Sequence, residues 1–440
     1  MQMKINLLIT GVLLYLISFQ VSAQDTIRHF QELENRVLSN SLTLKSGELK
    51  LTQAKKERLA AIFGLIDPTG SVTGSYTNNT KLPVNLIPAE ILGGQPGTFQ
   101  EVRFGVQYVT NLNSYVEVKL INLQAWESFQ LSRINVKVSE SDKKVALKNL
   151  LENCAIVYYN IINLQEQLIA FQQNFCAADT LYRFTLDKFS NGLASTQDLN
   201  DSKVNKLNIE ESINQLQYQI KQQYIALKIL CDIPDDNKLL IGANVGSTEF
   251  SRSVTVDVNP LVADNATERA RLARSAFRAS KYSVAPALSL FASYQSQQYS
   301  TRANFFDNGV DWSTSNYIGI KLSIPLPNSQ TFKQVGKAKY DYLMAKNYAE
   351  QMNLQVLLNS KQLLIDYNKA ESQLNSNLEI FKLRRENYQR NLLNYKEGVA
   401  GLEQTVNSFN SMISSQYSYI SSVVNLLLVK EKIDINNKLK

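Results

Sequence analysis

The sequence predicts an α+β membrane protein in which short β-strands are joined to long helical hairpins. Three observations support this fold class. Gly192 is the only glycine between Gly105 and Gly242, and no proline occurs between Pro96 and Pro234; both residue types disrupt helix interiors, so long helices are expected there. Other segments alternate apolar and polar residues, as β-strands do. The chain also repeats its pattern in two halves.

The first 23 residues resemble an export signal. Lys4 precedes an apolar run over residues 5–19, and small residues follow at Val21-Ser22-Ala23. This order of charge, short apolar run and small residues is typical of a signal peptide. We therefore expect a signal peptide at 1–23 and a mature chain that begins at Gln24 and works outside the cytoplasm. No later apolar stretch is long enough for a transmembrane helix.

Composition argues against several other classes of protein. The 440 residues include 46 basic and 39 acidic side chains, a net charge of +7, and these are interspersed along the chain. A nucleic-acid-binding protein would gather its basic residues in a patch, so no nucleic-acid partner is expected. The three cysteines have no metal-ligand spacing, and Cys154 falls on an apolar helical stripe, which favours a core position. No cofactor and no metal site are predicted.

The internal duplication rests on three matches that occur in the same order in both halves. They are "PTGSVTGSY" with "PALSLFASY", "YVEVKL" with "YIGIKL", and "FSNGLA" with "YKEGVA". Each half then has the same order of elements: a helix, a strand, a polar loop, a strand, and a long helical hairpin.

This order sets the predicted domain boundaries. The first repeat covers residues 24–231, with strands at 67–80 and 112–123 and a helical hairpin at 124–231 whose tip is Gly192. A linker follows at 232–264. The second repeat covers residues 265–440, with strands at 285–299 and 315–326 and a hairpin at 331–432 whose tip is Gly398.

Each predicted strand has one apolar and one polar face. Val116 and Val118 oppose Glu117 and Lys119, and Ile318 and Ile320 lie on the face opposite Lys321. Such alternation occurs in outer-membrane strands with an apolar outer face and a polar lumen, and also in half-buried strands of soluble sandwiches. In the barrel reading, Glu117, Lys119 and Lys321 are candidate lumen charges.

The long helices carry apolar residues in steps of three and four, which is the pattern of a coiled-coil seam. Between Leu147 and Tyr182 this rhythm continues without a break. A helix from Gln124 to about Asn191 would be about 100 Å long at the rise of an α-helix. Such a rod must pack beside other rods.

Four strands cannot close a membrane barrel, because single-chain barrels need at least about eight. Several copies must therefore share one barrel: two copies would supply eight strands, and three would supply twelve. Eight-stranded barrels are filled by side chains, whereas larger ones stay open. Geometry therefore favours a homotrimer.

These features together resemble the TolC-type outer membrane factors. The resemblance rests on the signal peptide, the duplicated halves, "FSNGLASTQD" and "YKEGVAGLEQTVN" at the hairpin turns, and "YIGIKLSIPLPNSQTFKQVGKAKYDYLMA" at a strand, turn and helix start. It implies a homotrimer with a twelve-stranded barrel in outer-membrane lipid of a Gram-negative bacterium, continuous with a long periplasmic α-helical barrel of coiled-coil hairpins.

The resemblance also implies a function. Such proteins are passive exit ducts of tripartite efflux or type I secretion systems. They join a periplasmic adaptor (membrane fusion) protein and an inner-membrane pump of the RND, ABC or MFS type to export drugs or other small molecules, or proteins. Carried over by position, Gly192, Leu193, Gly398 and Val399 would form the tips that dock the adaptor.

The resemblance places a periplasmic gate beside these tips. Asp198 and Tyr395 match residues that link neighbouring coils in the closed state. Gln404 and Asn407 stand where well-known members have two aspartates, and Ala400 replaces an arginine that helps to lock the closed state. An acidic, cation-binding ring is therefore not expected here.

Two other classes of protein are alternatives to a duct. An enzyme is not expected, because the mature chain has a single histidine, His29, and no glycine-rich phosphate-binding motif. A secreted or surface coiled-coil structural protein or adhesin would share the heptads and the signal peptide. It would not need two pairs of alternating strands at matching places.

Overall fold

The computed structural model describes residues 25–235, 239–242, 254–303, 309 and 311–439. The predicted signal peptide and part of the predicted linker lie outside these residues. The described chain divides into two compact units. Unit 1 comprises the described residues up to Leu49, within Ser141–Asn265 and from Glu350 on, and unit 2 comprises those within Lys50–Glu140 and Ala266–Ala349.

The described helices and strands include the predicted types of element and several further ones. The first half contains β1 (Asp25–Ile27), α2 (Phe30–Asn40), α3 (Leu42–Phe63), β2 (Thr69–Asn78), β3 (Val84–Pro88), η1 (Ala89–Leu92), β4 (Phe99–Arg103), β5 (Tyr108–Ile121), α4 (Leu123–Ser190) and α5 (Thr196–Leu230). After it come β6 (Leu239–Ile241), α6 (Leu261–Lys281), η3 (Tyr282–Val284), β7 (Ala287–Ser300), β8 (Trp312–Ser323), α7 (Ser329–Lys396) and α8 (Leu402–Lys438).

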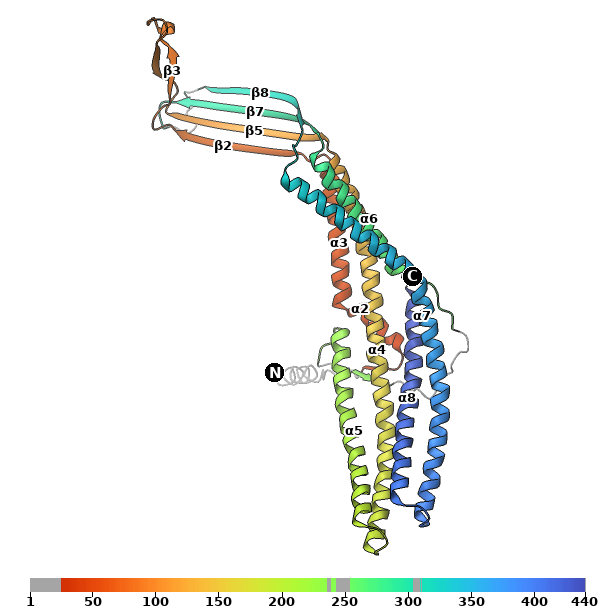
Figure 1. Cartoon of the computed structure of the whole chain (residues 1–440). Coiled ribbons are helices and arrows are strands. Elements are labelled where there is room, and N and C mark those ends of the chain that lie inside the picture. The colour runs from red at the N-terminus through yellow and green to blue at the C-terminus, as the bar shows by residue number, and fades with distance from the viewer. Residues whose placement is uncertain (1–24, 236–238, 243–253, 304–308, 310, 440) are drawn as a thin grey trace, which may run out of the picture. The chain divides into compact units, whose positions relative to one another are not determined.

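Unit 1 consists mainly of two antiparallel helical hairpins (Figure 1), the α5 hairpin with the lower part of α4 and the α8 hairpin with the lower part of α7. One apolar cluster joins all four helices: Ala178 of α4, Ile209 of α5, Tyr388 of α7 and Phe409 of α8 are all buried in it. Because a long helix is stabilised chiefly by packing its apolar face, this shared core holds the two hairpins side by side.

A second apolar cluster lies at the other end of the α4–α5 hairpin. The short helix α2 buries Leu33 and Val37 there, against Leu151 and Tyr158 of α4. Strands β1 and β6 pair in parallel beside it, with Ile27 opposite Ile241. These three elements were not predicted. The sheet pairing joins residues far apart in the sequence, so no local pattern indicates it.

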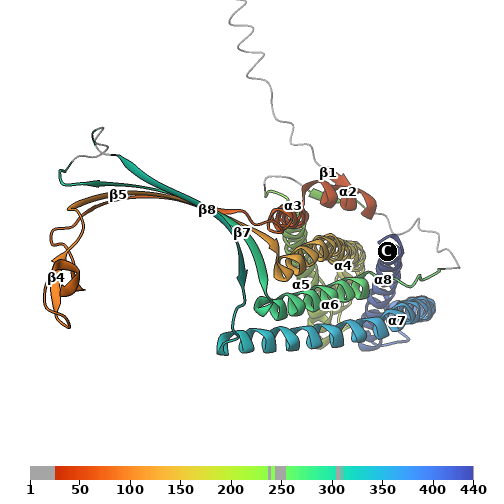
Figure 2. The same ribbon diagram turned by 90° about the horizontal axis from the view of Figure 1, so that it is seen from above.

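Unit 2 contains an antiparallel sheet in the order β2-β5-β7-β8. Strands β2 and β5 come from the first repeat and β7 and β8 from the second, and the repeats meet where β5 pairs with β7. The sheet is curved rather than flat (Figure 2). A separate hairpin of β3 and β4 occupies the stretch that was predicted to be a loop.

The apolar face of the sheet is uncovered within the chain. Ile318 is 73% exposed and Ile320 69% exposed, and Val72 and Leu322 are also exposed. Aliphatic side chains at such density on one sheet face normally mark a surface that contacts a partner or lipid. Among the described helices, none is both long and apolar enough to cross a membrane.

Candidate functional site: the two helical tips

The two hairpin tips have the same backbone geometry. Gly192 has φ 74° and Gly398 has φ 78°, a region that favours glycine. At the first tip, Gly192 N–H donates to Phe189 O (3.0 Å) and Leu193 N–H to Lys188 O (2.8 Å).

At the second tip, Gly398 N–H donates to Tyr395 O (3.2 Å) and Val399 N–H to Asn394 O (2.8 Å). Each tip is therefore a Schellman turn with its glycine at the left-handed position.

Each turn ends in an exposed aliphatic side chain. Leu193 is 75% exposed and Val399 is 76% exposed. In a Schellman turn the residue at this position commonly packs on the third or fourth residue from the helix end. The first tip has Lys188 and Asp187 there, and the second has Asn394 and Leu393, which is itself 57% exposed. Among the described residues, both tips thus present an aliphatic group that is largely open.

The two tips differ in how the next helix begins. Ser195 caps α5: its hydroxyl oxygen accepts from Asp198 N–H (3.1 Å), and the Asp198 carboxylate accepts from Ser195 N–H (3.0 Å). This is a capping box. At the matching place, Gly401 begins α8 with no side-chain cap. Asp198 is therefore occupied in stabilising its own helix start.

Tyr395 lies in the contact between the tips rather than on an open surface. Only 5% of it is exposed, and it packs with Leu181 and Leu402. Its hydroxyl is 3.2 Å from Thr185 Oγ1. Lys188 Nζ lies 4.2 Å from the centre of the Tyr395 ring and donates to the Tyr395 carbonyl (2.8 Å). These contacts join α4 to α7 in the last helical turns before the two tips.

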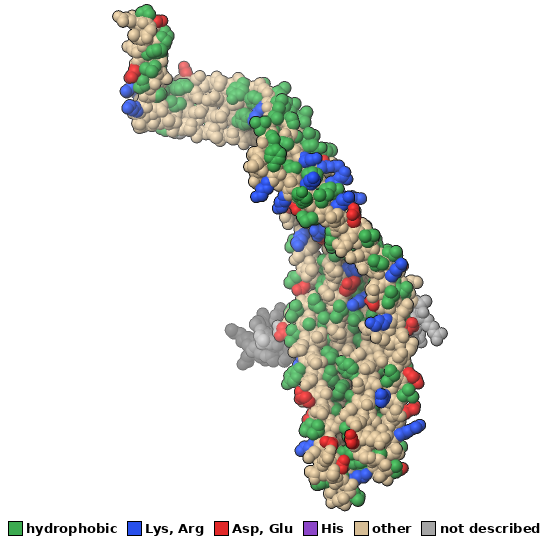
Figure 3. Space-filling view, in the orientation of Figure 1, with side chains coloured by type: hydrophobic (Ala, Val, Ile, Leu, Met, Phe, Trp, Pro, Cys, Tyr) green, Lys and Arg blue, Asp and Glu red, His purple; other side chains and the backbone are tan. Residues whose placement is uncertain are grey.

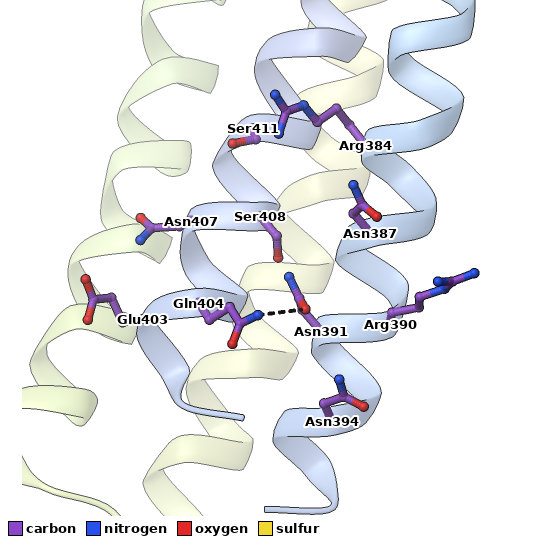
Figure 4. Close-up of a pocket in the computed structure, with 10 residues that line it drawn as sticks. All are labelled: Arg384, Asn387, Arg390, Asn391, Asn394, Glu403, Gln404, Asn407, Ser408 and Ser411. Carbon is purple, nitrogen blue, oxygen red and sulfur yellow. Dashed lines mark hydrogen bonds between the residues drawn. The ribbon is translucent and has the colours of Figure 1, made fainter. Parts of the chain in front are cut away.

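A polar groove runs between α7 and α8 beside the second tip (Figure 4). Its volume is about 740 Å³. It is lined by amides (Asn387, Asn391, Asn394, Gln404, Asn407), serines (Ser408, Ser411) and the charged residues Arg384, Arg390 and Glu403. Gln404 donates to Asn391 Oδ1 (3.3 Å), so the two helices are bridged by a neutral amide pair.

The groove continues along both helices. A neighbouring cavity of about 630 Å³ shares Arg384, Asn407 and Ser411 and is lined further on by Asn410 and Ser414. Gln404 and Asn407 thus lie in one polar strip, whereas Asp198 and Tyr395 line neither cavity. Within one chain, the four predicted gate residues therefore lie in two places: Gln404 and Asn407 line the groove, and Asp198 and Tyr395 lie outside it.

The predicted lumen charges lie on the polar face of the sheet in unit 2. Lys321 donates to Glu117 (3.1 Å), which also accepts from the Tyr115 hydroxyl (2.6 Å). Lys119 pairs with Asp67. The Lys321–Glu117 pair links β8 of the second repeat with β5 of the first, whereas Lys119 and Asp67 both lie in the first repeat.

An aromatic row on the same face was not predicted. The rings of Tyr115 and Phe291 lie 6.1 Å apart, and those of Phe291 and Tyr317 also 6.1 Å apart. A Cβ atom on Gly319 would come within 2.9 Å of the Phe291 ring, so this glycine makes room for the row. The cross-strand register, which the sequence alone does not give, brings the three rings together.

Charged groups were also compared with the pattern of a metal site. Across the described residues, no group of three metal-ligating side chains occurs. On the face of unit 1 drawn in Figure 3, acidic and basic side chains are scattered among neutral ones.

Solved structures share this fold along nearly the whole chain. The outer membrane protein VceC from Vibrio cholerae matches with a TM-score of 0.72 over 92% of this chain and 94% of its own, at 15% sequence identity. The CmeC outer membrane channel of Campylobacter jejuni matches with a TM-score of 0.67 over 92% and 85%, at 16% identity. The open MtrE outer membrane channel of Neisseria gonorrhoeae matches with a TM-score of 0.68 over 93% of this chain and 88% of its own, at 14% sequence identity.

The chain has the fold of the TolC-type outer membrane channels. The predicted resemblance to these channels is thereby confirmed at the level of the fold of one chain, while the homotrimer, the twelve-stranded barrel and the coiled-coil helical barrel stay predictions. No protein-family model and no curated protein sequence matches the chain. The TolC-type fold is therefore recognisable here from three-dimensional structure and from the order of short motifs, at an identity where residue roles do not transfer automatically.

Proposed function

We propose that this protein is the outer-membrane exit duct of a tripartite export system, and that it works as a homotrimer. The observation that carries the proposal is the sheet of unit 2. Its edge strands β2 and β8 have no partner on their outer sides among the described strands, and its apolar face is exposed. Long edge strands with exposed aliphatic residues invite aggregation unless another chain or a membrane covers them.

A barrel closed by copies of the same chain would pair the open edges of β2 and β8 and would turn the apolar face toward lipid. Neighbouring strands in the sheet are antiparallel throughout, so β8 runs opposite to β2. Pairing of β8 with β2 of the next copy would therefore continue the antiparallel pattern. Three copies would supply twelve strands and leave an open lumen, whereas two would supply eight and leave a barrel filled by side chains.

The two faces of the sheet suit a membrane barrel. Ile318, Ile320 and Leu322 would face outer-membrane lipid, and Glu117, Lys119 and Lys321 would line the lumen. Unit 1 would then supply the periplasmic extension, an α-helical barrel of six hairpins in the trimer. The protein would sit in the outer membrane of a Gram-negative bacterium.

We propose that the exposed aliphatic residues at the tips bind a periplasmic adaptor protein. Leu193 and Val399 are equally exposed at the ends of two turns with the same geometry, so one adaptor motif could contact both. An inner-membrane pump of the RND, ABC or MFS type would complete the assembly, with drugs or other small molecules as cargo. A protein cargo, as in type I secretion, would use the same duct.

The gate of such a duct would be neutral rather than acidic. Gln404 and Asn407 line the groove between α7 and α8, with Arg384 beside them. Carboxamides cannot bind a cation as a carboxylate ring does, because they carry no charge. The gate would therefore depend on packing around Tyr395 and on amide hydrogen bonds.

Cross-linking from the tips tests this proposal. Leu193→Cys and Val399→Cys would be introduced into a Cys176→Ser background, since Cys176 is exposed. In cells, a thiol cross-linker should join both sites to an adaptor of the same identity. Tyr218→Cys, at a site 65% exposed on α5 and about 30 Å from the tip, is the matched control and should give little product.

Two outcomes would contradict the proposal. Trimers in the outer membrane whose tips capture no adaptor would remove the docking role. Release of the protein into the medium as a soluble rod would instead favour the alternative of a secreted coiled-coil structural protein or adhesin.

A further inference from the structure

Two of the three cysteines meet in the core of unit 1. Cys154, in the middle of α4, and Cys231, at the end of α5, are 77 positions apart in sequence, and their Sγ atoms lie 3.8 Å apart. Both side chains are fully buried. Cys176 is exposed elsewhere on α4 and takes no part in this contact.

The surroundings of the pair argue against metal binding or catalysis. Its neighbours in the apolar cluster include Leu151, Leu227 and Ile233. No third metal-ligating side chain joins the pair within the described part of the chain. The hydrogen bond with Cys231, and then burial, raise the pKa of the Cys154 thiol well above its usual range, so the thiolate form of Cys154 is disfavoured once the protein has folded.

We infer that Cys154 and Cys231 are joined by a structural disulfide in the mature protein. The inference rests on the proposed function, which puts unit 1 in the periplasm, where disulfides form and persist. The two Sγ atoms would have to approach from 3.8 Å to about 2.05 Å, the length of a disulfide bond.

The bond would form by exchange with a periplasmic protein disulfide. One cysteine thiolate attacks that disulfide and forms a mixed disulfide, and the second thiolate then displaces the oxidant's sulfur. The two cysteines lose two electrons and two protons, and the oxidant is reduced to its dithiol. Because both side chains are buried in the folded chain, the exchange takes place before the core of unit 1 closes.

The position of the pair suggests what the bond stabilises. Directly after Cys231, Asp232 adopts φ 53° and its carboxylate accepts from Leu42 N–H (2.8 Å) at the start of α3. The disulfide would therefore fix the point where α4, the end of α5 and the start of α3 meet. It would also close a loop that contains the whole first tip, which restricts the unfolded chain. The second hairpin contains no cysteine.

Thiol counting on the full chain tests the inference. Cells are quenched with acid, and the protein is denatured and labelled with a polyethylene-glycol maleimide, with or without prior reduction. One label, on Cys176, is expected without reductant, and three are expected after reduction. The Cys176→Ser variant should take up no label without reductant and two labels after reduction. The Cys154→Ala variant should take up two labels without reductant, on Cys176 and on Cys231, which then has no partner cysteine.

Fractionation of the same cells separates the possible failures. Three labels without reductant on protein from the outer membrane would overturn the disulfide and leave the proposed function intact. Three labels on protein that stays in the cytoplasm would overturn both.

A stability measurement gives an independent readout. Reductant should lower the thermal unfolding midpoint of the wild type and of Cys176→Ser, and should leave Cys154→Ala/Cys231→Ala unchanged. An unchanged midpoint in the wild type would contradict a stabilising disulfide.

Discussion

Ser195 and Gly401 occupy the same position in the two helical tips, yet only Ser195 has a side chain that can cap a helix. Ser195 and Asp198 satisfy two N–H groups at the start of α5. Gly401 leaves the start of α8 without a side-chain cap, and Gln404, three residues on, donates to Asn391 instead. Two differences between the repeats, Ser195 against Gly401 and Asp198 against Gln404, therefore leave only the first tip with a capping box.

Substitutions at these two positions should have opposite effects. Ser195→Ala should destabilise the first turn of α5 by about 1 kcal/mol, because a capping side chain is lost. Gly401→Ser should stabilise α8 by a few tenths of a kcal/mol, because serine with Gln404 at the third helical position can form a capping box. Hydrogen exchange of the tip amides would report both. Equal exchange in the two variants would contradict the assigned caps.

Glu431 is the residue whose charge should make unit 1 sensitive to pH. Burial is the main cause that raises the pKa of this carboxyl from 4.5 to about 7; a hydrogen bond from the Tyr159 hydroxyl lowers it, and Asp434 and Glu34 raise it further. The folded chain holds this proton more tightly than the unfolded chain. The resulting stability is fully present below about pH 4.5 and is lost as the pH rises through about 7.

We therefore expect Glu431→Gln to remove this part of the pH dependence of the unfolding free energy. Between pH 5 and pH 7.5 the wild type should lose about 1–3 kcal/mol of unfolding free energy relative to the variant. Denaturation midpoints of both proteins at the two pH values measure this. A gap between the two proteins that does not change with pH would contradict the assignment.

At the scale of elements, periodicity located the long helices and the four strands of the larger sheet. Alternation is readable in part of β5, β7 and β8, where aliphatic residues such as Val116, Leu290 and Ile320 recur at every second position. Strands β3 and β4 are five residues each, and Pro88 ends β3, so their stretch resembles a loop. The parallel pairing of β1 with β6 depends on a contact between distant segments, which no local pattern encodes.

The two faces of β8 should respond differently to the same charge. Ile320→Lys puts a cation on the aliphatic face and should reduce trimer assembly in membranes, by up to about 2–4 kcal/mol per chain at the middle of the bilayer. Ser315→Lys, on the opposite face of the same strand, should assemble normally. Heat-modifiable trimer bands on gels would measure both variants. Equal assembly of the two would argue against lipid contact at Ile320.

At the scale of the whole molecule, the duplication was the most informative feature of the sequence. Structures only 13–16% identical share the fold with TM-scores near 0.7, so the order of turns, strands and heptads carries the architecture more than individual residues do. Site roles were harder to predict. Within one chain Asp198 caps its own helix, a contact that was not predicted, and its role at a gate stays a prediction.

Assembly of the proposed duct depends on surfaces that one chain leaves open. Among the described residues, strands β2 and β8 end the sheet on both sides and its aliphatic face is exposed, so in the proposed pore other copies must complete the barrel. The number of copies that closes the sheet depends on curvature and on the contacts between copies.

Electron cryomicroscopy of the full chain extracted from outer membranes tests the central claim most directly. We predict three copies around a threefold axis, with β8 of each copy paired antiparallel to β2 of the next. One continuous passage should run through the sheets and the helical hairpins. A monomeric rod, or a sheet closed by a different number of copies without such a passage, would contradict the exit-duct account.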